Sequence, residues 1–162
     1  MNSDLLNGVD SENEIDLFTR DDTDGWKVYY FYPKDFTFIC PTEISAMDMI
    51  SSDSVEVMGF SGDNEFCKVA WKEVNGMIRN VSHPLVADCG LGLSSELGIV
   101  DEDEGVCLRA TFIVDEDNII QHVSVNALDT GRNAQEILRT LEALQAGGLT
   151  GCEWQPGEDF VA

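Results

Sequence analysis

Positive charge is scarce in this chain. Its 162 residues include 9 lysines and arginines against 31 aspartates and glutamates, which gives a formal net charge of −22. Nucleic acids and anionic membrane surfaces are bound through Lys and Arg, so this balance argues against both as partners. The carboxylates predict a well-solvated acidic surface, with adaptation to a salty cytoplasm as the sharper alternative.

Long apolar runs are also missing. A membrane-spanning helix needs about 20 consecutive apolar residues, and the sequence contains no such run. Residues 1–20 are polar and acidic and lack the basic flank and apolar core of a signal peptide. We therefore expect a cytoplasmic protein with no membrane partner. Its length suits one domain with a sizeable core.

The cysteines show no pairing pattern. Five are present and none forms a Cys-x-x-Cys pair, which argues against a secreted disulfide scaffold. The two histidines lie at irregular distances from them, so we expect no metal site and no cofactor. Cys67, Cys89 and Cys107 are interpreted as small packing residues.

The most informative segment surrounds Cys40. It spans residues 33–43 and reads PKDFTFICPTE. Because Pro41 favours the first turn of a helix, Cys40 is predicted at a helix N-terminus, where free N–H groups and the helix dipole stabilise a thiolate. Thr37 lies three residues earlier, which brings its hydroxyl towards the sulfur. The segment predicts an activated thiolate with a hydroxyl beside it.

The spacing Pro-x-x-x-Thr-x-x-Cys, followed by Pro-Thr-Glu, resembles the active-site signature of the peroxiredoxins. It is more similar still to the alkyl hydroperoxide reductase C-subunit type, the typical 2-Cys members of the AhpC/TSA family. Other segments are similar to that family in the same order: 26–43, 61–71, 83–98, 109–115, 125–145 and 151–157. The resemblance covers most of the chain after residue 20.

This resemblance implies a thiol-dependent peroxidase that reduces hydrogen peroxide and organic hydroperoxides. Cys40 would attack the peroxide and become a sulfenic acid. Arg109 would contact the thiolate and the peroxide, and Thr37 would bind the peroxide. An attack of this kind needs a thiolate, a hydrogen-bonding group and a positive charge, which these residue types supply.

Further roles follow from the same resemblance. Pro33 would shield the pocket from water, and Glu43 would accept a hydrogen bond from Arg109 and orient it. Arg132 matches a family arginine close to Arg109 and Glu43, and it is expected to bind the substrate. Cys152 would attack the Cys40 sulfenic acid of a partner subunit. A homodimer is therefore implied, with rings of dimers left open.

Two departures from the family pattern stand out. Lys68 occupies a position where many members carry histidine. Glu153 and Trp154 follow Cys152, in place of a Cys-Pro pair, and this spacing is similar to actinobacterial alkyl hydroperoxide reductases. The external dithiol reductant is left open: a thioredoxin, a flavoprotein reductase or a Cys-x-x-Cys adaptor protein.

The order of predicted elements favours an α/β protein with a thioredoxin-like fold, in which helices flank a central mixed sheet. Strands are expected at 26–32, 55–61, 110–114 and 119–125, and helices at 41–51, 64–71 (capped by Asp63), 91–97 and 133–145. We expect one domain over residues 1–146 and a C-terminal tail over 147–162 that carries Cys152.

Two other function classes would use a reactive cysteine on a related fold. A dithiol–disulfide oxidoreductase would need cysteine at position 43, where the chain has Glu43. A peroxide-sensing redox switch or a holdase chaperone would use the same Cys40 chemistry, so the sequence leaves it open. Trp71 is interpreted as a core residue, and His83 and His122 as surface or strand residues.

Overall fold

The computed structural model describes residues 25–162, so the expectations for residues 1–20 lie outside it. The described residues form two compact units, one that ends at Arg132 and one that spans Asn133–Ala162. The predicted boundary at residue 146 stays a prediction. Among the described residues no helix is long and apolar enough to cross a membrane.

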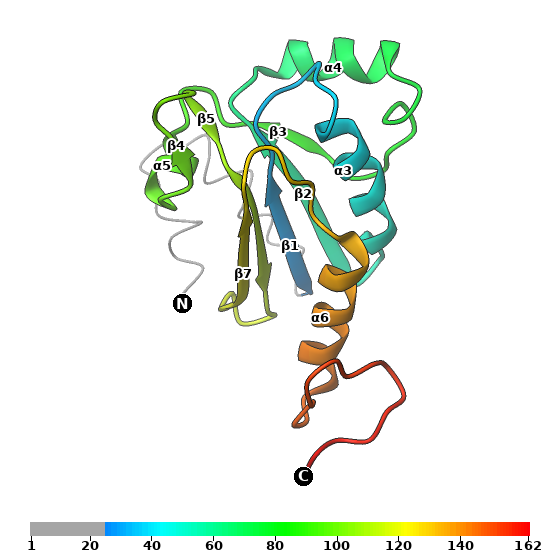
Figure 1. Cartoon of the computed structure of the whole chain (residues 1–162). Helices are drawn as coiled ribbons and strands as arrows, with labels where there is room; N and C mark the ends of the chain where they lie inside the picture. The colour runs from blue at the N-terminus through cyan, green and yellow to red at the C-terminus, as the bar shows by residue number, and fades with distance from the viewer. Residues whose placement is uncertain (1–24) are drawn as a thin grey trace. The chain divides into compact units, whose positions relative to one another are not determined.

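The first unit is built on a five-stranded mixed sheet with the order β3-β2-β1-β6-β7 (Figure 1). The strands are β1 (Trp26–Phe31), β2 (Val55–Ser61), β3 (Leu85–Ala87), β6 (Arg109–Val114) and β7 (Ile120–Asn126). β1, β2 and β3 pair in parallel, whereas β6 and β7 are antiparallel to their neighbours. The predicted mixed sheet is thereby confirmed.

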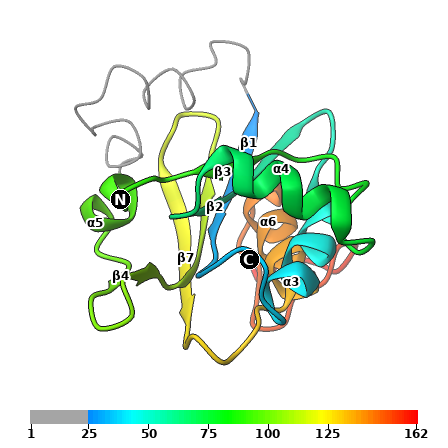
Figure 2. The same ribbon diagram turned by 90° about the horizontal axis from the view of Figure 1, so that it is seen from above.

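Helices make the crossovers that parallel strands require. α3 (Cys40–Met47) and the 3-10 helix η1 (Asp48–Ile50) connect β1 to β2, and α4 (Glu65–Val74) connects β2 to β3. α5 (Gly92–Glu96) and a small sheet of β4 (Val100–Asp101) and β5 (Val106–Cys107) follow. Figures 1 and 2 show α3 and α4 on one side of the sheet, and α5 with β4 and β5 on the other.

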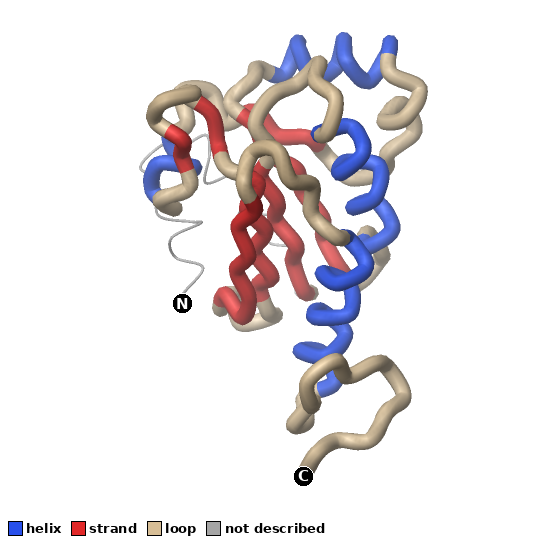
Figure 3. The backbone as a smooth tube through the Cα atoms, in the orientation of Figure 1, coloured by secondary structure: helices blue, strands red, loops and turns tan. Residues whose placement is uncertain are grey.

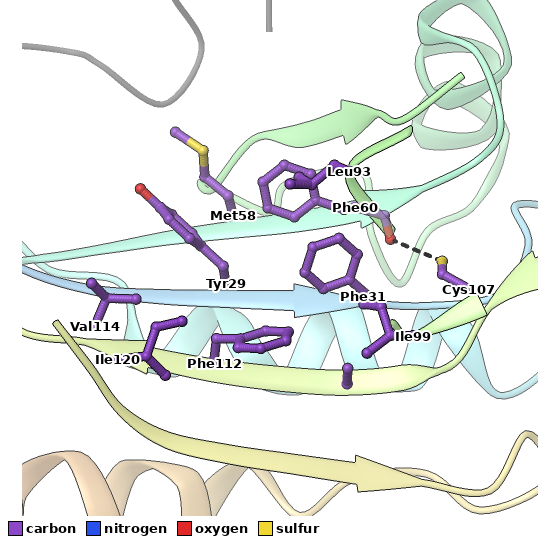
Figure 4. Packing of buried hydrophobic residues seen from close by; sticks show 11 residues of the cluster. Tyr29, Phe31, Met58, Phe60, Leu93, Ile99, Cys107, Phe112, Val114 and Ile120 are labelled. Atoms are coloured by element: carbon purple, nitrogen blue, oxygen red, sulfur yellow. Dashed lines mark hydrogen bonds between the residues drawn. The ribbon is translucent and has the colours of Figure 1, made fainter. Parts of the chain in front are cut away.

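The core of this unit follows from the alternation of side chains along the strands. On one face, Tyr29 and Phe31 of β1 pack with Met58 and Phe60 of β2, and Phe31 stacks on Phe60 with ring centroids 4.9 Å apart (Figure 4). Tyr30 lies between them and points to the other face, where its hydroxyl is 2.6 Å from His83 Nε2. The chain enters α3 from the end of β1 through residues 32–39, the loop drawn in tan between them (Figure 3).

Two local predictions need correction. The helix expected over 41–51 is α helix only to Met47 and then tightens into η1. The predicted cap Asp63 does not begin α4, because Asn64 is the N-cap and accepts a hydrogen bond from the Cys67 backbone N–H. The Asp63 carboxylate instead accepts the backbone N–H of Asp35 at 2.7 Å.

The second unit contains α6 (Ala134–Ala146) and the C-terminal segment. Asn133 caps α6 through a hydrogen bond from the Glu136 backbone N–H, and Gly147 ends it with a φ of 70°. The segment after α6 folds back on itself, since Val161 N–H donates to the Leu149 carbonyl at 2.9 Å. Trp154 is buried within this segment.

Candidate active site

Cys40 is the first residue of α3, with Pro41 directly after it. The position needs no side-chain cap: Thr42 and Glu43 donate their backbone N–H groups to the Ile39 carbonyl. The Cys40 side chain is buried, with 1% of its surface exposed. A buried sulfur can carry negative charge only if nearby groups stabilise it.

Arg109 is the cation placed next to this sulfur. It opens β6, two strand positions from the Thr111–Tyr30 pair that joins β6 to β1. Its Nη1 lies 3.4 Å from Cys40 Sγ, and its Nε donates to the Leu128 carbonyl at 2.7 Å. Burial would lower the pKa of Arg109, but the hydrogen bond and charge of Cys40 and the charge of Glu43 raise it above the ordinary value. Arg109 therefore stays a cation beside the thiol.

Glu43 joins this arginine to a second one. Its Oε2 accepts from Arg109 Nη1 at 2.5 Å, and its Oε1 accepts from Arg132 Nε at 2.9 Å and from the Arg132 backbone N–H at 3.0 Å. All three side chains are at most 5% exposed. The two guanidinium groups outnumber the single carboxylate, so the charge left over at Cys40 is positive.

Arg132 is itself held by the sheet. It donates to the carbonyls of Phe31 and Ala110 and to Thr111 Oγ1, and its guanidinium lies 4.9 Å from the centre of the Tyr30 ring. These contacts come from β1 and β6. The two central strands thus fix both arginines of the site.

Thr37 and Pro33 lie in the loop between β1 and α3. The Thr37 hydroxyl donates to the Lys34 carbonyl at 2.8 Å, which leaves its oxygen lone pairs as acceptors. Pro33 is half-buried and lines a pocket of about 340 Å³ whose other walls include Gly62, Leu91 and Val106. Neither Cys40 nor Arg109 lines that pocket.

The remaining cysteines lack such surroundings. Cys107 is fully buried; burial raises its pKa to about 12, and its thiol donates to the Tyr32 carbonyl at 2.8 Å. Burial and the nearby Asp35 raise the pKa of Cys67. Cys89 is exposed, so its interpretation as a packing residue is wrong; Cys152 is also exposed and belongs to the second unit. In the described part of the chain, no three His, Cys, Asp or Glu side chains gather as a metal site would require.

Sequence reasoning missed two buried networks. His83 is not a surface residue: it is 2% exposed, its Nε2 lies 2.6 Å from Tyr30 Oη, and its Nδ1 lies 2.7 Å from Asp48 Oδ1. Lys68 and Asp35 form a buried ion pair. Only the departure of Lys68 from the family pattern gave a signal for either network.

Comparison with known proteins agrees with this geometry. Residues 6–123 match the AhpC/TSA family. Alkyl hydroperoxide reductase C of Mycolicibacterium smegmatis is 42% identical, covering 96% of this chain and 84% of the relative. Its counterpart from Mycobacterium tuberculosis is 38% identical, covering 94% and 82%.

Solved structures give the same result. The reduced 2-Cys peroxiredoxin of Plasmodium vivax aligns with a TM-score of 0.78 and 36% identity, covering 83% of this chain and 75% of that one. Mycobacterium tuberculosis AhpC aligns with a TM-score of 0.70 and 41% identity, covering 77% and 76%. The predicted thioredoxin-like fold is confirmed by these neighbours. The chain belongs to the AhpC/TSA family of thiol-dependent peroxidases.

Proposed function

We propose that Cys40 is the residue that attacks the peroxide and that Cys152 of a partner subunit regenerates it. The observation that carries this proposal is the contact of Arg109 Nη1 with Cys40 Sγ at 3.4 Å, backed by Glu43 and Arg132. No other described cysteine has a guanidinium hydrogen-bonded to its sulfur.

In the first step, the Cys40 thiolate attacks one peroxide oxygen. A sulfur–oxygen bond forms as the O–O bond breaks, and the departing oxygen takes a proton to leave as water or an alcohol. Arg109 stabilises the charge that develops on that oxygen. The Thr37 oxygen accepts a hydrogen bond from the bound hydroperoxide, while Pro33 limits access of water.

In the second step, the Cys152 thiolate attacks the sulfur of the Cys40 sulfenic acid. A disulfide forms between subunits, and hydroxide leaves and is protonated to water. An external dithiol supplies two electrons to restore both thiols; a thioredoxin, a flavoprotein reductase and a Cys-x-x-Cys adaptor remain the candidates. Such a transient disulfide suits a cytoplasmic homodimer.

The test is hydrogen peroxide consumption with excess dithiothreitol by the wild type, Cys40→Ser and Cys152→Ser. We expect Cys40→Ser to lose activity and Cys152→Ser to lose the disulfide-linked dimer seen on non-reducing gels. Cys89→Ser is the matched control for an exposed thiol and should retain both. Wild-type turnover by Cys40→Ser would refute the assignment, and a linked dimer of Cys152→Ser would refute the second step.

A further inference from the structure

A second cluster of buried charge lies beside the active-site loop and outside the residues assigned above. Lys68 of α4 and Asp35 of the loop form an ion pair of 3.2 Å, with side chains 4% and 0% exposed. The Lys68 ammonium also donates to Tyr32 Oη at 3.1 Å and to Ser61 Oγ. All three of its donors are therefore used.

The Asp35 carboxylate is satisfied just as completely. It accepts from Tyr32 Oη at 2.8 Å and from Ser61 Oγ at 3.1 Å, in addition to Lys68. Its backbone N–H donates to Asp63. The pair thus ties the loop to the end of β1, the end of β2 and α4. A buried carboxylate left without Lys68 would be strongly unfavourable.

The next residue has an unusual backbone. Phe36 has a φ of 56°, a left-handed conformation that is strained for a bulky side chain. Its ring stacks on Trp71 with centroids 5.9 Å apart. Lys68 and Trp71 are three residues apart on α4, so they lie on one face of the helix and hold Asp35 and Phe36 in succession.

We propose that Lys68 is a positioning residue for the peroxide site: by pairing with Asp35 it keeps the strained turn at Phe36 in place and so fixes Thr37. This inference rests on the proposed function. The effect is one of geometry, because Asp35 neutralises the Lys68 charge and the pair adds no net charge near Cys40. Thr37 directly follows the strained turn, so relaxation of Phe36 would move it.

The test uses Lys68→Met and two reactions of the reduced protein. The first is oxidation by hydrogen peroxide, followed by stopped-flow tryptophan fluorescence. The second is alkylation of Cys40 by iodoacetamide, followed by mass spectrometry. We expect the peroxide rate constant to fall about tenfold to a hundredfold, as for a misplaced binding group. In the double variant Asp35→Asn/Lys68→Met, which keeps the net charge of the pair at zero, alkylation should be unchanged, because it needs the thiolate and Arg109 but no peroxide-binding loop.

Lys72→Met is the matched control. Lys72 lies one turn further along α4 and donates to the Val81 carbonyl, away from the loop, so both rates should equal those of the wild type. If circular dichroism shows that Lys68→Met does not fold, the double variant Asp35→Asn/Lys68→Met is used, because it removes the ion pair without leaving an unpaired buried charge. This double variant should show the same selective loss of the peroxide reaction.

A wild-type peroxide rate in a folded Lys68→Met or double variant would overturn the inference. A parallel fall in both reactions of the double variant would overturn it as well, because that outcome indicates a general change at Cys40. Failure of the proposed function has a different result. In that case Cys40→Ser would still react with hydrogen peroxide at the rate of the wild type.

Discussion

At the scale of single residues, the reactivity that we propose for Cys40 depends on a local excess of positive charge in a very acidic chain. The formal net charge is −22, and this field opposes a thiolate. Arg109 and Arg132 share one carboxylate, that of Glu43, and all three are buried. Charges interact more strongly when buried than at a solvated surface, so these near groups dominate over distant surface carboxylates.

Arg109→Lys tests whether charge alone is sufficient. Lysine keeps the charge but cannot contact Cys40, Glu43 and the Leu128 carbonyl at once, as the planar guanidinium does. We expect the second-order rate constant for peroxide to fall by roughly a hundredfold to a thousandfold, measured by stopped-flow fluorescence. Arg79→Lys, at an exposed arginine, is the control. Equal rates for wild type and Arg109→Lys would show that the planar shape of the guanidinium is not needed.

The sequence could predict the residues near Cys40 but not those behind them. Cys40, Thr37 and Glu43 lie in one short signature, and Arg109 opens a recognisable strand. The pairing of Lys68 with Asp35 joins residues 33 positions apart, and that of His83 with Tyr30 joins residues 53 apart. Such pairs depend on how α4 packs against the sheet and how β3 joins its edge. Local sequence patterns do not determine either.

At the scale of elements, strong periodicity gave reliable predictions. β2 was predicted over its full length, and α6 to within one residue at each end, because its apolar spacing and the cap at Asn133 coincide. β3, β4 and β5 were missed, since two or three residues carry no readable alternation. Their pairing is set by the neighbouring strands.

The parallel packing of β1 and β2 predicts a specific intolerance at Gly59. This glycine pairs with Tyr30, and a Cβ there would lie 2.5 Å from Tyr30 Oη, which His83 holds in place. We expect Gly59→Ala to lower the free energy of unfolding by about 1–3 kcal/mol, measured by urea denaturation. Gly76→Ala is the control, because no atom lies within 4 Å of its Cβ position. Equal stabilities of the two variants would contradict this account.

At the scale of the whole molecule, the dependence of stability on pH separates into two ranges. Asp and Glu side chains have reference pKa values of about 4, so carboxyl groups affect stability mainly at acidic pH. Burial alone would raise the pKa of Asp48, but hydrogen bonds from His83 and Ser82 lower it below the usual value. Asp48 therefore affects stability only at low pH. Near neutral pH, histidine is the side chain whose charge is expected to change and so to alter stability.

His83 should therefore make the folded protein less stable as the pH falls below neutral. Burial lowers the pKa of His83 despite its bond to Asp48, and Lys72 adds a smaller effect in the same direction. The unfolded chain then binds a proton near pH 6.5 that the folded protein does not, so stability is complete above that pH and declines below it. Neutral His83 also suits its contacts, since Nδ1–H can donate to Asp48 while Nε2 accepts from Tyr30. Urea unfolding between about pH 7.5 and about pH 5.5 should show a smaller loss for His83→Gln than for the wild type. A parallel loss in both proteins would mean that other groups control this range.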